Sequence, residues 1–129
     1  NIAVTSAAGG TLTLFKDGSA IGSTSAPSTT STTALYNLII GAVNISGITN
    51  VLDGLLDEVA IFNTTLTSSE IAAIYNSGVP NDISSLNPVS WWRMGDNDSG
   101  SGTTITDQGS GGNNGTLTNG PTFSSIVPS

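Results

Sequence analysis

The sequence predicts a small all-β domain, a sandwich or barrel of short antiparallel strands, with one short helix near residues 67–77. Three observations lead to this prediction. Charged residues make up only 9% of the 129-residue chain, against about 25% in an average soluble domain. Ser, Thr, Asn and Gly replace them, which favours short strands joined by polar turns. Stretches rich in β-branched residues alternate with Gly- and Asn-containing turns.

A β-hairpin is predicted near the N-terminus. Residues 2–5 and 11–16 have the composition of strands. Asp17 and Gly18 form a two-residue turn of the kind that hairpins favour, because both residues tolerate a positive φ. Residues 19–22 then form the returning strand.

Two further strands are expected before the helix. The most hydrophobic segment, residues 34–42 (ALYNLIIGA), is predicted to be a central strand. Residues 57–62 form the next one, since Val59 and Ile61 alternate with Ala60 and Phe62, and β-branched residues favour a half-buried pleated surface.

The helix is indicated by a capping box. Thr67 is followed three residues later by Glu70, so hydroxyl and carboxylate can satisfy the free amides of the first turn. Ile71 and Ile74 give the helix one apolar face. Gly78 is predicted to end it in a left-handed conformation.

The remaining segments change in character. Residues 79–88 read as a Pro- and Asn-containing linker, and residues 89–94 as a strand that holds both tryptophans. Two short strands are predicted beyond an acidic, Gly-rich loop, at residues 103–106 and 115–118.

The net charge of −7, with only Lys16 and Arg93 as cations, excludes a nucleic-acid surface, because binding phosphates requires a basic field. The same sign of charge argues against an anionic membrane. The sequence has no apolar run of the length that membrane insertion requires. Histidine and cysteine are absent, which removes the commonest general base, thiol nucleophiles and most zinc sites.

Three stretches resemble the laminin-G-type, concanavalin A-like jelly roll of the lectin/glucanase superfamily. Residues 1–22 resemble its mid-domain hairpin, with the turn FKDG, and residues 38–62 resemble its I-G…D-E-V segment. Residues 67–78 resemble the helix that follows. The resemblance implies an antiparallel jelly-roll sandwich with one short helix.

A fourth stretch is similar to the family but out of order. Residues 89–119, which begin VSWWRMGD, resemble the family's first strand and loop, yet they lie at the C-terminal side. The resemblance implies that residues 1–78 are the C-terminal half of a laminin-G-like jelly roll and residues 79–88 a linker. Residues 89–129 would be a tail that packs on the same sandwich or on a neighbouring subunit. Cores ending in W-W-R-M-G-D look like those of phage structural and fibre proteins.

A jelly roll without half its strands would expose long unpaired edges, which folded proteins avoid. We therefore expect that upstream residues complete the sandwich, or that a neighbouring subunit donates strands. The start of the chain, which reads like the middle of a strand, suggests that Asn1 is not the native beginning.

The acidic residues offer two kinds of site. Asp57 and Glu58 are neighbours on a predicted strand, so they point to opposite faces and cannot flank one glycosidic bond; we expect them to hydrogen-bond the turn. Asp96, Asp98 and Asp107 have a spacing that partly matches a calcium loop, which makes Ca²⁺ the candidate cofactor. A solvated acidic loop is the alternative.

Trp91, Trp92 and Arg93 are the candidate contact residues. Neighbouring side chains on a strand face opposite ways, so one tryptophan is predicted to face the core and the other to stack on a sugar or on a subunit. Burial of one ring and partial cover of the other is the alternative. Four Asn residues match the N-glycosylation pattern, or do so by chance in a chain rich in Asn, Ser and Thr: Asn44, Asn63, Asn97 and Asn114.

These features together predict a non-enzymatic structural or attachment module, extracellular or on a virion surface. It would self-associate or join other structural subunits as a fibre, decoration or tail component. The alternative is a carbohydrate-binding, lectin-like domain, assisted by calcium. A glycoside hydrolase of this superfamily carries acids in the pattern E-x-D-x-x-E, and no such run occurs here.

Overall fold

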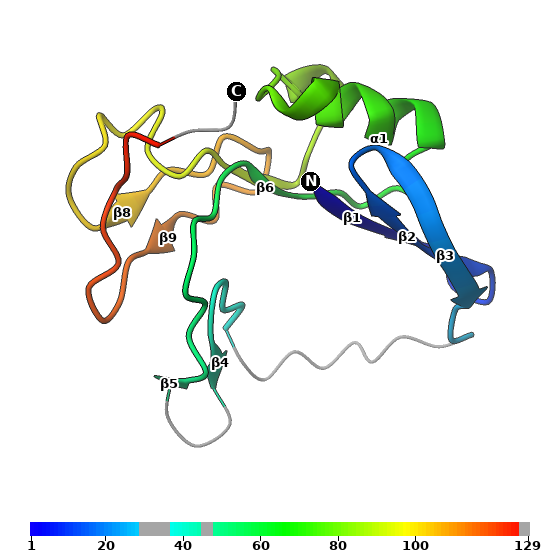
Figure 1. Ribbon diagram of the computed structural model, residues 1–129, viewed down its shortest axis with the longest axis horizontal. Helices are drawn as coiled ribbons and strands as arrows, with labels where there is room; N and C mark the ends of the chain where they lie inside the picture. The colour runs from blue at the N-terminus through cyan, green and yellow to red at the C-terminus, as the bar shows by residue number, and fades with distance from the viewer. Residues whose placement is uncertain (29–36, 45–47, 127–129) are drawn as a thin grey trace.

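The computed structural model describes residues 1–28, 37–44 and 48–126. These residues form one three-stranded sheet, three two-stranded sheets and one α-helix, as Figure 1 shows. Part of the predicted central strand, residues 34–36, lies outside the described residues, as does part of the glycosylation triplet that begins at Asn44.

The largest sheet is antiparallel, with the strand order β1 (Ile2–Ser6), β2 (Thr11–Lys16) and β3 (Ser19–Ser25). It confirms the predicted hairpin, although β3 extends beyond Gly22. The turn residues Asp17 and Gly18 have φ values of 50° and 75°, which match the two-residue turn expected from their types. The N-terminal ammonium group donates to Oδ1 of Asp17 at 2.8 Å.

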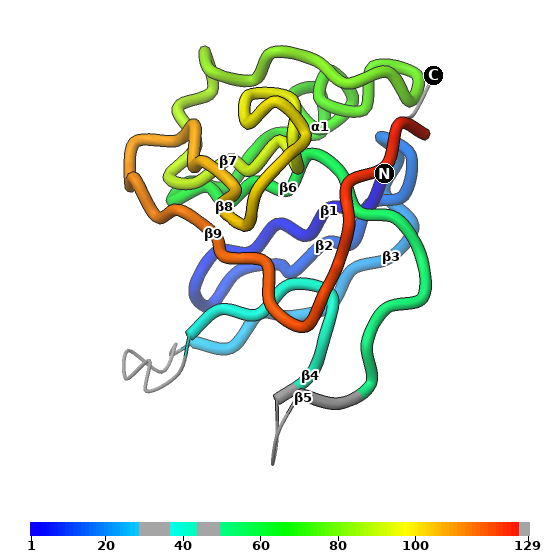
Figure 2. The backbone as a smooth tube through the Cα atoms, turned by 90° about the vertical axis from the view of Figure 1, so that its left-hand side faces the viewer, coloured from blue at the N-terminus to red at the C-terminus, as the bar shows by residue number. Residues whose placement is uncertain are grey.

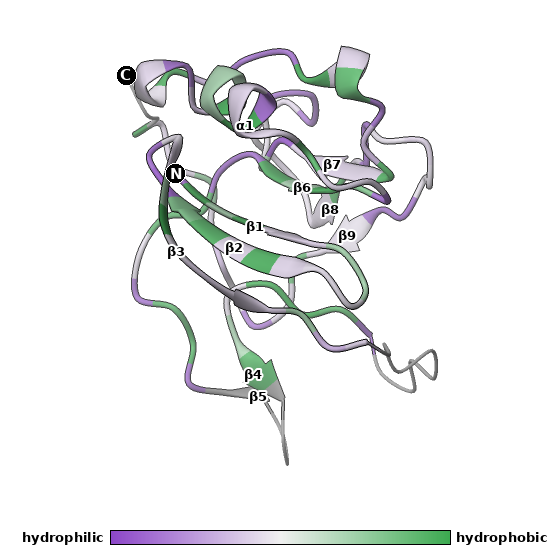
Figure 3. Ribbon diagram, turned by 90° about the vertical axis from the view of Figure 1, so that its right-hand side faces the viewer, coloured by the Kyte–Doolittle hydropathy of each residue, from purple (hydrophilic) through white to green (hydrophobic). Residues whose placement is uncertain are grey.

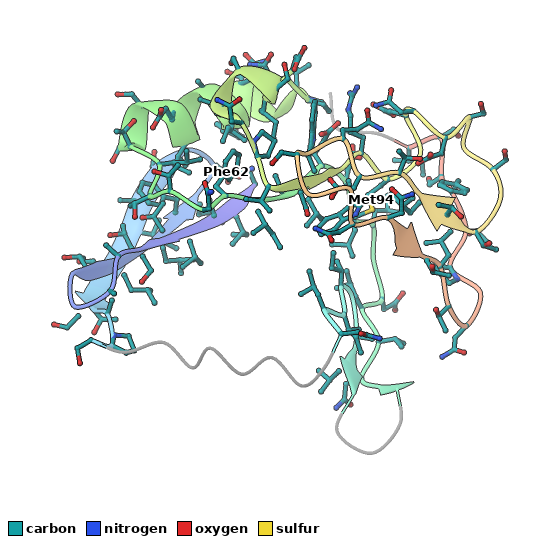
Figure 4. The ribbon with its side chains drawn as sticks, turned by 180° about the vertical axis from the view of Figure 1, so that it is seen from behind. Phe62 and Met94 are labelled. Atoms are coloured by element: carbon teal, nitrogen blue, oxygen red, sulfur yellow. The ribbon has the colours of Figure 1, made fainter. Side chains whose placement is uncertain are left out.

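One face of this sheet packs against the helix. Phe15 on β2, Leu66 and Ile71 form a buried cluster, with exposures of 3%, 8% and 3%, and Phe62 packs against it from outside. Figure 4 shows Phe62 between the helix and the three-stranded sheet. Burying side chains of this size from two elements is what fixes the helix on the sheet.

The helix α1 spans Ser68–Tyr75 and confirms the predicted capping box. Oγ1 of Thr67 accepts from the amide of Glu70 at 3.2 Å, and Oε2 of Glu70 accepts from the amide of Thr67 at 2.7 Å. The left-handed residue that ends α1 is Asn76, with φ 42°, so the prediction that the helix runs on to Gly78 is wrong. A 3₁₀ turn, η1 (Asn76–Gly78), follows.

The other half of the molecule consists of short strand pairs. The strand β6 (Val59–Ile61) pairs with β7 (Ser90–Trp92), and β8 (Thr104–Ile105) with β9 (Gly115–Thr116). Figure 2 shows these four strands, and Figure 1 shows β8 and β9 at the opposite end of the molecule from the β1–β3 sheet. Each strand is shorter than predicted. Between α1 and β7, the predicted linker contains the 3₁₀ turn η2 (Ser84–Leu86).

The predicted central strand is not a strand within its described part, residues 37–42. Leu38 is 62% exposed there. The neighbouring sheet consists of β4 (Val43–Asn44) and β5 (Ile48–Thr49). A hydrophobic run indicates a tendency to be buried, but it does not supply the partner strand that burial requires.

The described residues are thus β-rich and antiparallel with one short helix, as predicted. Their sheets are small, and a closed jelly-roll sandwich is not among them. The tail pairs with the preceding part of the same chain through β6 and β7. In the described part of the chain, no helix has the length and hydrophobicity needed to cross a membrane.

Candidate functional site

The candidate site is centred on Trp91, the middle residue of β7. Its side chain is buried, and its indole N–H donates to Oε2 of Glu58 at 2.6 Å. The guanidinium carbon of Arg93 lies 5.1 Å from the centroid of the Trp91 ring, within the range of a cation–π interaction. Trp91 therefore interacts with an acid and a base of its own chain.

Arg93 joins two carboxylates. Its Nε donates to Oε1 of Glu58 at 3.0 Å, and one terminal nitrogen donates to Oδ2 of Asp96 at 2.7 Å. Burial alone would lower the pKa of Arg93. The hydrogen bond that Arg93 donates to Glu58 and the charges of Glu58, Asp96 and Asp57 outweigh burial and raise that pKa above its usual range. The guanidinium is therefore fixed as a permanent cation at this site.

Glu58 uses its two carboxylate oxygens for Trp91 and Arg93. Its φ is 51°, in the left-handed region, and its amide donates to Oδ1 of Asp57 at 3.0 Å. The prediction that Asp57 and Glu58 both lie on a strand is wrong, because β6 begins at Val59. A non-glycine residue in this conformation is uncommon, and here the backbone turn aims the Glu58 carboxylate at β7.

The surroundings of Asp57 disfavour the ionised form of its carboxyl group. Burial, followed by the charges of Glu58 and Asp96, raises the pKa of Asp57 above its ordinary value. A group with a raised pKa in the folded state opposes folding when it is ionised.

We expect Asp57→Asn to increase the free energy of unfolding at neutral pH. The substitution removes a charge that burial and the carboxylates of Glu58 and Asp96 disfavour. It retains the side-chain oxygen that accepts from the amide of Glu58. The gain should be absent in acid, where the Asp57 carboxyl is protonated in the folded and the unfolded state. Urea unfolding followed by circular dichroism at both pH values measures this. Asp53→Asn, at an exposed acid, is the control. A loss of stability at neutral pH would contradict the expectation.

Trp92 is also buried, with 6% of its surface exposed. Its indole N–H donates to the carbonyl of Asn113 at 2.8 Å. The interpretation in which one tryptophan faces outwards is therefore wrong, and the alternative, in which a loop covers the second ring, is closer to the structure, with the cover more complete than expected. The two rings do point to different neighbours, as strand alternation requires, but the loop between β8 and β9 covers the second one.

Asp107 holds that loop against β7. Its carboxylate accepts from the backbone amides of Trp91 at 2.7 Å, Gly109 at 2.8 Å and Asn113 at 2.7 Å. Burial opposes the charge of Asp107, but these three amides lower its pKa below the ordinary value. Hydrogen bonds to a charged acceptor are stronger than neutral ones, so Asp107 links β7 to the loop.

Gly109 brings the two backbones into direct contact. A Cβ atom at Gly109 would lie 2.5 Å from the carbonyl oxygen of Val89 and 2.6 Å from Cα of Ser90. Any side chain at this position would therefore displace the loop from the strand. Sequence reasoning missed the roles of Gly109 and Glu58. The signal available for Gly109 was the Asp-x-Gly spacing of an Asx-turn.

A protein-family model described as "Concanavalin A-like lectin/glucanases superfamily" matches residues 1–72, which is more than half of the chain. The chain belongs to this superfamily. Neither the curated proteins nor the solved structures contain a match to it. The matched residues include the hairpin, the strand β6 and the start of α1. The strand β7, which holds Trp91, and the following residue Arg93 lie beyond the matched residues.

The predicted calcium site requires that the carboxylates of the acidic loop be available to a cation. Asp96 binds Arg93, the carboxylate of Asp98 accepts from the amide and hydroxyl of Thr106, and Asp107 accepts from three amides. Within the described ranges, no three acidic side chains converge on a point that would suit a metal ion. The residues as arranged do not fit a calcium site, and calcium binding stays a prediction.

The glycosylation candidates differ in their surroundings. Asn63 and Asn97 are exposed. Asn114 is also exposed, but its side-chain oxygen accepts from the amide of Asp107 at 3.0 Å, so the side chain is already engaged. The side chain of Asn44 lies outside the described residues. Glycosylation of these positions stays a prediction.

An open groove lies between two other segments of the chain. Its volume is about 640 Å³, and it runs between residues 52–55 and 120–126. Leu52, Leu55 and Phe123 supply apolar walls, while Asp53 and Ser124 add polar groups. Sequence reasoning did not find this groove, because neither segment carries a signal that it lies beside the other.

Proposed function

We propose that the chain is a structural or attachment module without catalytic activity, which assembles with itself or with neighbouring subunits in an extracellular or virion setting. A fibre, decoration or tail component would be such a module. The observation that carries the proposal is the number of large apolar side chains left exposed to solvent. They lie on several elements and include Ile2, Val4, Ile21, Leu38, Val51, Leu52, Leu55 and Ile126.

Small sheets support the same proposal. An isolated two-stranded hairpin is at best marginally stable in water, and three of the four sheets in the described residues have two strands. Two of these small sheets also carry exposed apolar side chains, Val43 on β4 and Ile61 on β6. Exposed apolar surface marks sites of association in soluble proteins where it forms a patch.

The contacts of Glu58 weigh against a hydrolase. Both of its oxygens are engaged, by the indole of Trp91 and the guanidinium of Arg93. A catalytic carboxyl group in a glycosidase needs access to the substrate, whereas both oxygens of Glu58 contact side chains of the same chain.

We expect the purified chain to form oligomers whose mass increases with protein concentration. Sedimentation velocity over a wide concentration range measures this directly. Assembly should persist after removal of divalent cations with a chelator and should not change when free sugars are added. A chain that sediments as a monomer at every concentration would contradict the proposal. Hydrolysis of β-glucans that is lost in Glu58→Gln would replace it with an enzymatic one.

The lectin-like alternative is favoured by one observation, the groove between residues 52–55 and 120–126. Apolar and aromatic walls combined with a few polar groups are typical of sites for small ligands. Binding on a glycan array that disappears in Asp53→Ala and in the presence of a chelator would support this alternative. Binding unaffected by both treatments would place any glycan elsewhere.

A further inference from the structure

We propose that two copies of this chain meet through the face of the β1–β3 sheet that points away from α1. We call this surface the open face and define it by Ile2 and Val4 on β1 and by Leu12 and Leu14 on β2. The inference rests on the proposed function of self-assembly and names the surface responsible for it.

Strand register places these residues on one side. Ile2 is opposite Lys16, and Val4 is opposite Leu14, so these side chains share a face. Ala3 is opposite Phe15, which points to the helix and the buried cluster. Figure 3 shows the hydrophobic stretch of β2 beside β1 and β3.

The third strand adds Gly22 and Thr24, which are opposite Leu14 and Leu12. Ala20 is opposite Phe15, so its side chain lies on the helix side of the sheet. Ile21 is the extra residue at the register shift between Leu14 and Phe15, where a bulge interrupts strand alternation, so it is not counted in the open face. The large apolar side chains of the open face therefore come from β1 and β2.

The open face is exposed to solvent. Ile2 is 66% exposed, and Val4 is 58% exposed. Phe15, on the other face of the same sheet, is 3% exposed. A sheet in which both faces carry large aliphatic residues normally has both faces covered, and here the described residues cover only one.

Charge favours a second copy as the occupant. The chain has a net charge of −7, so most of its surface repels another copy. Within residues 1–28 the one acidic residue is Asp17, which lies on the turn and pairs with the N-terminal ammonium at 2.8 Å. Lys16 lies at one end of the open face. Two open faces can approach each other without bringing carboxylates together.

Symmetry and size set the expected form of the contact. Two identical faces related by a two-fold axis are self-complementary, and two sheets packed in this way lie about 10 Å apart. Three strands at about 4.8 Å spacing and about six residues long cover roughly 300 Å² in projection. A stable interface needs about 800 Å² per partner, so this contact alone gives weak association that depends on concentration.

The test compares variants by sedimentation velocity at concentrations up to the order of millimolar. Ile2→Lys and Val4→Lys place a charge on the open face. Val79→Lys places the same charge at an apolar residue that is 47% exposed and lies outside the sheet. Ile2→Thr and Val4→Thr keep a β-branched side chain if the lysine variants do not fold. Far-UV circular dichroism verifies the fold of each variant.

We expect the open-face variants to weaken dimerisation about tenfold or more, while Val79→Lys associates like the original chain. If the chain assembles and the open-face variants assemble equally well, this inference is wrong and the proposed function remains. If the original chain stays monomeric at every concentration, the proposed function fails together with the inference.

Discussion

Replacing Asp107 with alanine is expected to lower the free energy of unfolding by about 3 kcal/mol or more, because buried amides then lose their acceptor. The amides concerned belong to Trp91, Gly109 and Asn113. For a domain of this size such a loss is a large part of the total stability. Urea unfolding at neutral pH, followed by far-UV circular dichroism, measures the change.

Asp107→Asn is the matched variant, since it keeps an oxygen acceptor and removes the charge. It should be less destabilised than Asp107→Ala. The pKa of Asp107 is lowered in the folded state, so its contribution to stability is fully present above the unfolded pKa of about 3.9. This contribution is lost as the pH falls through the lower folded pKa. The difference between the original chain and Asp107→Asn should therefore disappear in strong acid. Equal stability of Asp107→Ala and the original chain at neutral pH would show that the carboxylate does not hold the loop.

Gly109→Ala is expected to destabilise the protein by about 3 kcal/mol, at the upper end of overpacking effects. The added methyl group would meet backbone atoms of Val89 and Ser90 at 2.5–2.6 Å, and backbone atoms cannot rotate away as a side chain can. Gly22→Ala is the control, because a Cβ atom at Gly22 has no neighbour within 4 Å. The same unfolding experiment compares the two. Similar stabilities for both variants would mean that the loop can move away from β7 at little cost.

The parts of the fold that were predictable from sequence depend on neighbouring residues. The hairpin turn needs only two residues that tolerate positive φ, Asp17 and Gly18, and the capping box needs only Thr67 and Glu70. Both interactions form within a few residues, so their signals are complete in the local sequence. Membership of the superfamily followed from the same stretches.

The candidate site was only partly predictable, because its contacts join residues far apart in the chain. Glu58 contacts Trp91 and Arg93 across the β6–β7 pair, and nothing near Glu58 indicates those partners. Asp107 was predicted as a calcium ligand from spacing alone. An acidic side chain beside glycines suits backbone amides as well as cations, and here it binds the amides.

The apolar segment at residues 34–42 shows that local composition alone does not determine burial. Its composition predicts burial, but burial in a strand requires neighbours on both edges and at least one covered face. Whether those exist depends on the rest of the fold. Leu38 is exposed in the described part of the segment.

Both tryptophans of the chain lie side by side on β7, and each is buried. The intrinsic fluorescence of this protein therefore comes mainly from one strand. An emission spectrum will report solvent reaching β7, and the neighbouring Glu58 carboxylate and Arg93 cation will influence its wavelength. It will be almost insensitive to changes in the hairpin around Phe15, so that half of the molecule can unfold locally while the emission spectrum stays native.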